Sequence, residues 1–123
     1  MNAAVSPGHP IVLTSMRDEN QVIAIMAAIE GYDLPSSPAW SDLDELSSHT
    51  EFDSLEASPD GIFEGPRGTF HVVANVYVTL NYGPPDDSAS LSDSFPVQIT
   101  GTISDSNEVE VTTVEVDTSS FFE

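Results

Sequence analysis

The sequence predicts an α+β fold in which an antiparallel β meander of three to five strands carries one or two helices on one face. Residues 69–82 and 95–103 alternate between apolar and mainly polar side chains, which is the period of a half-buried strand. Apolar residues in 22–29 instead recur at helical spacing. Because no strand–helix–strand pattern is present, we expect helices and sheet to pack as two layers.

Residues 69–82 form the expected central strand. β-branched and aromatic residues dominate this stretch, as they do in strands generally. The residues expected on its buried face are Phe70, Val72, Ala74, Val76, Val78, Leu80 and Tyr82.

Length and composition favour a single small acidic domain spanning residues 1–123. Within it we expect a flexible lead-in at 1–14, a helical part at 15–50 and a β part at 51–123. The absence of Cys excludes disulfides and thiolate metal sites. No apolar run is long enough for a membrane span or built like a signal peptide, so we expect a cytoplasmic protein that does not bind a membrane.

The first helix is expected from about Met16 to Glu30. Ser15 and Asp18 have the spacing of a capping box, and Gly31 is expected to end the helix. The apolar stripe consists of Val22, Ile25, Met26 and Ile29, widened by Ile23.

The stretch between this helix and the central strand is expected to contain short elements. A linker at 33–38 precedes a short helix that begins near Ser41 and ends at about Ser48. An edge strand through Phe52 and Leu55 follows. The Ser-Pro-Asp-Gly sequence at 58–61 predicts a type I turn, after which 62–64 form a short strand and 65–68 a turn.

The C-terminal part is expected to form a loop at 83–94, a strand at 95–103, a turn at 105–107 and a last strand. Pro96 is confined to the start of its strand or to an unpaired side. Val109 and Val111 alternate in one phase, and the next valines, at 114 and 116, in the other, so we expect a β-bulge at 112–113. Phe121 and Phe122 should require cover from the core or from a partner.

The chain has 21 acidic residues, only Arg17 and Arg67 as bases, and a formal charge of −19. Direct binding to nucleic acid is not expected, because such binding depends on Lys and Arg at the phosphates. Three explanations of the acidity stay open: a solvated surface adapted to high salt, complementarity to a basic protein partner, and imitation of a nucleic-acid backbone.

We identify no catalytic, cofactor-binding or metal-binding residues. His9, His49 and His71 lie in unrelated sequence contexts, without the spacing of a zinc site. Carboxylates cluster at 42–45 and at 86–93. The second cluster has oxygen ligands for a weakly held divalent cation, but it lacks the spacing of an EF-hand loop. We expect both to be solvated.

A candidate interaction surface follows from the polar face of the central strand, which carries one large aromatic residue. The alternative is a solvated face partly covered by the acidic loop after the strand. The residues assigned to this candidate surface are Asn75, Tyr77, Thr79, Asn81, Asp86, Asp87 and Asp93.

From about Asp60 onward, the chain resembles a small C-terminal β module found behind nuclease-type domains of bacterial defence proteins, including predicted nucleases associated with prokaryotic Piwi-like systems. The elements that carry the resemblance are Asp60-Gly61, the run 76–83 (VYVTLNYG), 93–96 (DSFP) and 116–121 (VDTSSF). The resemblance implies an accessory domain and supplies no active-site residue.

We therefore expect a non-enzymatic accessory or protein-binding domain associated with a bacterial or phage defence system. The alternative is an acidic inhibitor or antitoxin-like protein that blocks a basic nucleic-acid-binding site. A third hypothesis is a hydrolase that uses paired carboxylates, which would need a formed pocket and one raised pKa.

Overall fold

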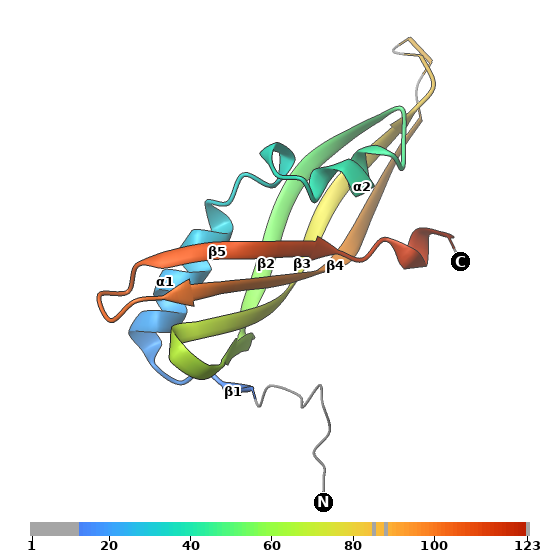
Figure 1. Ribbon diagram of the computed structural model, residues 1–123. Helices are drawn as coiled ribbons and strands as arrows, with labels where there is room; N and C mark the ends of the chain where they lie inside the picture. Colours follow the sequence, from blue (N-terminus) through green and yellow to red (C-terminus); the bar gives the residue numbers. More distant parts are fainter. Residues whose placement is uncertain (1–12, 85, 88, 123) are drawn as a thin grey trace, which may run out of the picture.

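The chain forms a five-stranded antiparallel sheet whose strands follow one another in sequence order, β1-β2-β3-β4-β5 (Figure 1). The computed structural model describes residues 13–84, 86–87 and 89–122. The predicted meander is confirmed, and the expected lead-in lies mostly outside the described residues. The strands are β1 (Thr14–Ser15), β2 (His49–Glu64), β3 (Thr69–Tyr82), β4 (Ala89–Ile103) and β5 (Val109–Val116).

The described part of the chain also forms two α-helices and three short 3-10 helices. Helix α1 contacts both β2 and β5, so the curved sheet wraps partly around it (Figure 1). Among the described residues, no helix is long and apolar enough to cross a membrane. The helices are α1 (Glu19–Glu30), η1 (Leu34–Ser36), α2 (Trp40–Asp44), η2 (Pro66–Gly68) and η3 (Ser119–Phe122).

Strand β3 has the predicted bounds and the predicted phase. Its even-numbered residues from Phe70 to Leu80 are at most 1% exposed, and Tyr82 is half-buried. On the other face, Val73 is 46% exposed and Tyr77 is 39% exposed. β3 pairs with β4 at every position without a register shift, which makes it the centre of the sheet.

Helix α1 begins at Glu19, three residues later than predicted. The Asp18 carboxylate caps it, accepting hydrogen bonds from the backbone N–H groups of Asn20 and Gln21 at 2.9 and 3.2 Å. Ser15 is not part of the cap, because it lies in β1 opposite Phe63. An extended residue there cannot also open the helix.

The buried face of α1 is narrower than predicted. Ile25 and Ile29 are buried, and Val22 and Met26 are half-buried against the core. Ile23 was expected to widen this stripe but is 65% exposed. Two residues along a helix correspond to about 200° of rotation, which places Ile23 opposite Ile25.

Helix α2 ends at Asp44, four residues before the predicted end. Two side chains bind carbonyl groups at the end of this helix and just beyond it. The buried Thr50 hydroxyl donates to the Leu43 carbonyl at 2.9 Å, and the Tyr82 hydroxyl donates to the Leu46 carbonyl at 2.9 Å. These bonds fix the point at which the chain enters β2.

The predicted turn at 58–61 and the separate strand at 62–64 are wrong, because β2 continues through both. Ala57 pairs with Ala74, and Ile62 pairs with Val72. The chain thus advances five residues along β2 where β3 advances two. The Pro-containing segment is therefore a bulge within one strand. A neighbouring strand that continues past 58–61 on both sides holds the chain extended.

The predicted loop at 83–94 is also too long, since β4 begins at Ala89, opposite Tyr82. Ser90, Ser92 and Ser94 gave no strand signal on their own. They become a strand because β3 offers a full row of backbone partners as far as Tyr82.

The predicted bulge in the last strand is confirmed. Thr100 pairs with Thr113 and Gly101 with Val111, one step against two, which leaves Thr112 as the extra residue. The Thr112 hydroxyl donates to the Thr100 carbonyl at 2.9 Å. The bulge keeps the valines on both sides of it on the core side of β5, where all four are half-buried.

The chain end packs on the sheet through one of its two phenylalanines. Phe121 meets Phe95 edge-to-face at 6.5 Å between ring centroids, whereas Phe122 is 73% exposed. The turn before them is held by Asp117, which accepts a hydrogen bond from the Ser119 N–H at 2.9 Å. Hydrogen bonds from the Ser119 hydroxyl and backbone lower the pKa of the Asp117 carboxyl.

Two identical truncations on β3 test the phase of the strand. Val78→Ala removes two methyl groups from a fully buried site and is expected to lower the free energy of unfolding by about 2–3 kcal/mol. Val73→Ala, on the exposed face, should change it by less than about 0.5 kcal/mol. Urea denaturation measures both, and equal midpoints would contradict the assignment of faces.

Candidate interaction surface

One face of the sheet is left open, because the core cluster, which includes residues of α1 and α2, packs on the other face. Residues directly opposite each other on neighbouring strands share a face, so the register identifies its members. We call this surface the open sheet face. It comprises Glu51, Asp53, Ser54 and Glu56 of β2, Val73, Asn75, Tyr77, Thr79 and Asn81 of β3, and Ser90, Ser92 and Ser94 of β4.

The structure brings together the four candidate residues on β3. Asn75 and Tyr77 are exposed, and Thr79 and Asn81 are half-buried. All four lie on the open sheet face, where Tyr77 stands between Ser54 and Ser94 on the flanking strands.

The three aspartates assigned to the same surface lie elsewhere. Asp86 and Asp87 are in the turn between β3 and β4, beyond the paired part of the strands. Asp93 pairs with Val78 and is therefore on the core-facing side, half-buried, with its carboxylate accepting a hydrogen bond from the Ser94 N–H at 2.8 Å. The sequence predicted that Asp93 lies in a loop and belongs to the interaction surface. Its position in β4 instead places it on the core-facing side of the sheet.

Carboxylates of β2 are tied to the polar side chains of β3. The Thr79 hydroxyl donates to the Asp53 carboxylate at 2.8 Å. The Asn81 amide donates to Glu51 Oε1 at 3.0 Å and to the His49 carbonyl at 3.1 Å. These bonds hold two carboxylates in fixed positions on the surface.

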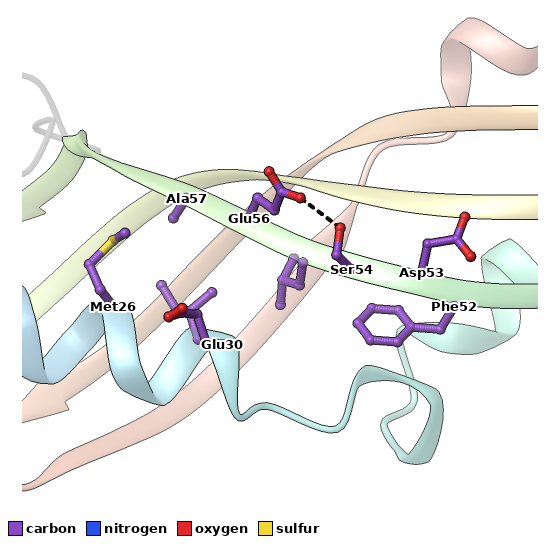
Figure 2. A pocket seen from close by; sticks show the side chains of 9 residues that line it. Met26, Glu30, Phe52, Asp53, Ser54, Glu56 and Ala57 are labelled. Carbon is purple, nitrogen blue, oxygen red and sulfur yellow. Dashed lines mark hydrogen bonds between the residues drawn. The ribbon is translucent and has the colours of Figure 1, made fainter.

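Two serines extend this hydrogen-bonded row. The Ser90 hydroxyl, on β4, donates to Asn81 Oδ1 at 2.6 Å. The Ser54 hydroxyl, on β2, donates to Glu56 Oε2 at 2.8 Å (Figure 2). The open sheet face is therefore ordered across three strands.

Sequence reasoning missed Glu51, Asp53 and Glu56. In a regular strand Glu51 and Glu56, five residues apart, would point to opposite faces. Phe52 pairs with Val78 and Ser54 with Tyr77, two steps against one, so Asp53 is a bulged residue that restores a common face. A bulge arises from pairing with the neighbouring strand, and no local signal in β2 marks it.

The three carboxylates form a negative row, and neither Arg of the described part of the chain lies on the strands that carry it. Glu51 and Glu56 lie opposite Thr79 and Asn75, four residues apart on β3, so the row spans about 13 Å. Arg67 lies in the turn before β3, at the other end of that strand, and Arg17 precedes α1. The row therefore attracts cations and basic groups.

A groove runs along the other side of β2, between that strand and α1 (Figure 2). Its volume is ≈ 460 Å³. Figure 2 shows Phe52 and Ala57 pointing to the α1 side of the strand, and Asp53, Ser54 and Glu56 pointing away from it. The groove is lined by Met26, Ile29 and Glu30 of α1 and by residues 52–57 of β2.

The described histidines do not form a site. His49 pairs with Asn81, ten residues along β3 from His71, which separates the two by roughly 33 Å. His9 lies outside the described residues. Within the described ranges, no three His, Asp or Glu side chains are arranged to hold a metal ion.

Comparison with protein families identifies the chain by its sequence. Residues 28–122 match the model of a family described as predicted pPIWI-associating nuclease. The chain belongs to this family. The match confirms the resemblance expected from 60 onward and extends it to the end of α1. Strands β2 to β5, the open sheet face and most of the groove lining therefore lie within the region shared with this family. No curated protein and no solved structure matches.

Repulsion within the acidic surface predicts that salt stabilises this family member. Raising NaCl from about 0.05 to 0.5 M shortens the screening length from roughly 14 to 4 Å, so the melting temperature should rise. The melting temperature of the variant Glu51→Gln/Glu56→Gln should rise less over the same range of NaCl, because two charges of the row of about 13 Å are removed. Thermal melts followed by circular dichroism measure both slopes. A flat or falling melting temperature for the unmodified chain would contradict the prediction.

Proposed function

We propose that the chain is a non-enzymatic accessory domain that binds a protein partner in a defence system containing a Piwi-like protein. The observation that carries the proposal is the open sheet face, with Tyr77 39% and Val73 46% exposed near a row of fixed carboxylates. Exposed aromatic residues within an ordered polar surface are typical of protein-binding sites.

The chemistry of the partner follows from the charge of the chain. A net charge of −19 and the row of Glu51, Asp53 and Glu56 favour a basic protein and steer it to the surface. The description of the family adds the setting, since it names pPIWI association. We therefore propose the Piwi-like protein of the same genome as the partner.

The non-enzymatic part of the proposal is supported by the separation of the two described histidines and by the exposure of the carboxylate row. General acid–base catalysis needs two groups within reach of one bond. His49 and His71 are roughly 33 Å apart. The Asp53 and Glu51 carboxylates accept hydrogen bonds from Thr79 and Asn81 on an open surface, where water is not excluded.

Truncation of Tyr77 tests the binding surface. Tyr77→Ala is expected to weaken binding of the Piwi-like protein by about thirtyfold, the size of a hot-spot loss. Phe122→Ala is the matched control, because Phe122 is a more exposed aromatic residue outside the open sheet face. Isothermal titration calorimetry measures both affinities. Equal losses, or no loss at Tyr77, would exclude the open sheet face as the interface.

Hydrolysis assays test the non-enzymatic role. Incubating the purified chain with single- and double-stranded DNA and RNA, with Mg²⁺ or Mn²⁺, should give no cleavage above buffer controls. Glu51→Gln/Asp53→Asn separates intrinsic activity from contamination. Cleavage that is lost in this variant while its fold is retained would replace the proposal with a nuclease.

A second candidate function is that of an acidic inhibitor, and one observation favours it. Three carboxylates lie in a row of about 13 Å on one face, an arrangement that could replace phosphates in a basic site. An inhibitor of this kind should compete with DNA or RNA for the Piwi-like protein, and its affinity should fall steeply with salt. Fluorescence competition at about 0.05 and 0.3 M NaCl tests this. Simultaneous binding of chain and nucleic acid would exclude it.

A further inference from the structure

Strand β2 is an edge of the sheet for most of its length. Within residues 13–84, 86–87 and 89–122, its outer partner is the short strand β1, which pairs with Phe63 and Glu64. The Met16 N–H also donates to the Ile62 carbonyl at 3.0 Å. From His49 to Ala57, β2 pairs with β3 and with no other strand among the described residues. Alternate backbone N–H and C=O groups of such an edge point outward and can pair with an added strand.

The two sides of this free edge differ in chemistry. On the open sheet face it carries Glu51, Asp53 and Glu56. On the opposite side, Phe52, Leu55 and Ala57 line the ≈ 460 Å³ groove together with Met26 and Ile29 of α1 (Figure 2). An extended segment laid along β2 would present its residues alternately to these two sides.

We propose that the free edge of β2 binds an extended partner segment in which basic residues alternate with apolar ones. The basic side chains pair with the carboxylates on the open sheet face, and the apolar side chains enter the groove between β2 and α1. This proposal rests on the proposed protein-binding function and specifies a second contact, beside Tyr77. Six residues of β2 line the groove, so a segment of about six residues fits it.

Charge selects this occupant over a second copy of the chain. Pairing of two β2 edges would be isologous and would place the same three carboxylates opposite one another. Like charges directly opposite are destabilising in a sheet, and each copy carries −19. The carboxylates and the Asp53 bulge thus disfavour pairing with neutral or acidic strands, whereas a basic strand can pair with the carboxylates.

The other edge of the sheet is a weaker competitor. Strand β5, Val109–Val116, is the edge strand on that side. The groove beside β5, bordered by Tyr32 and Pro38, is smaller, at ≈ 360 Å³, and only Glu115 among its lining residues is acidic. The free stretch of β2, residues 49–57, is about as long as β5, so what distinguishes the β2 site is its larger groove and its three carboxylates.

A synthetic peptide tests the proposal on the full chain. The probe is a capped peptide of alternating Arg and Ile, and its control has the same sequence with alternate backbone nitrogens methylated, which removes strand pairing but keeps charge and apolar area. Fluorescence anisotropy should show the methylated peptide binding at least about tenfold more weakly. Hydrogen exchange should show protection of residues 49–57 when the unmethylated probe binds.

Matched charge variants separate the edge from general attraction. The variant Glu51→Gln/Glu56→Gln should bind the probe peptide about tenfold more weakly, or weaker still. Glu110→Gln/Glu115→Gln, on β5, makes the same change in net charge and should alter binding by less than about twofold. Equal losses in the two variants, equal binding of the two peptides, or protection on β5 instead of β2 would each overturn the proposal.

The remaining outcomes distinguish this inference from the proposed function. Protection of residues 49–57 from hydrogen exchange in the absence of peptide would show that the chain itself covers the edge. A dimer in sedimentation experiments that the peptide does not dissociate would show the same, and either outcome would overturn the inference. If the Piwi-like protein binds in a Tyr77-dependent way but neither it nor the probe protects β2, only the edge site is wrong. If the probe protects β2 but the Piwi-like protein does not bind, the partner in the proposed function is wrong.

Discussion

Every other element of this fold depends on the unbroken pairing of β3 with β4. All fourteen residues of β3 have a partner on β4, and its even-numbered residues from Phe70 to Leu80 are buried. A slip of one residue would turn these apolar side chains outward and bring Asn75 and Tyr77 into the core. The energetic cost of that exchange fixes the register, and the flanking strands must adapt to it.

The edge strands adapt through bulges. β2 takes one extra residue at Asp53 and three more between Ala57 and Ile62, and β5 takes one at Thr112. Each bulge reverses the alternation that follows it. On β5 this keeps four valines on the core, and on β2 it keeps Phe52 and Leu55 on the groove while Glu51 and Glu56 share the open sheet face.

The fold accommodates a large negative charge by excluding it from the core. The buried residues are apolar apart from Thr50, whose hydroxyl is satisfied by the Leu43 carbonyl, so no buried carboxylate needs a counterion among the described residues. Repulsion between the surface carboxylates destabilises the folded chain. The same carboxylates disfavour pairing with neutral or acidic strands that could otherwise aggregate with the sheet edge. Under the proposed function, this charge would select a basic partner over a neutral or acidic one.

The sequence by itself determined the meander, the bounds and phase of β3, the bulge near Thr112 and four residues of the open sheet face, because each depends on the period of one strand. It also indicated the family from strand and turn elements that the family match includes. Only the tertiary structure decided the continuity of β2, the early start of β4 and the face of Asp93. These features depend on backbone partners supplied by β3, which override local signals such as the Ser-Pro-Asp-Gly turn and the serine-rich segment. Glu51, Asp53 and Glu56 share a face for the same reason, since the bulge at Asp53 is set by pairing with β3 and no break in the alternation of β2 marks it.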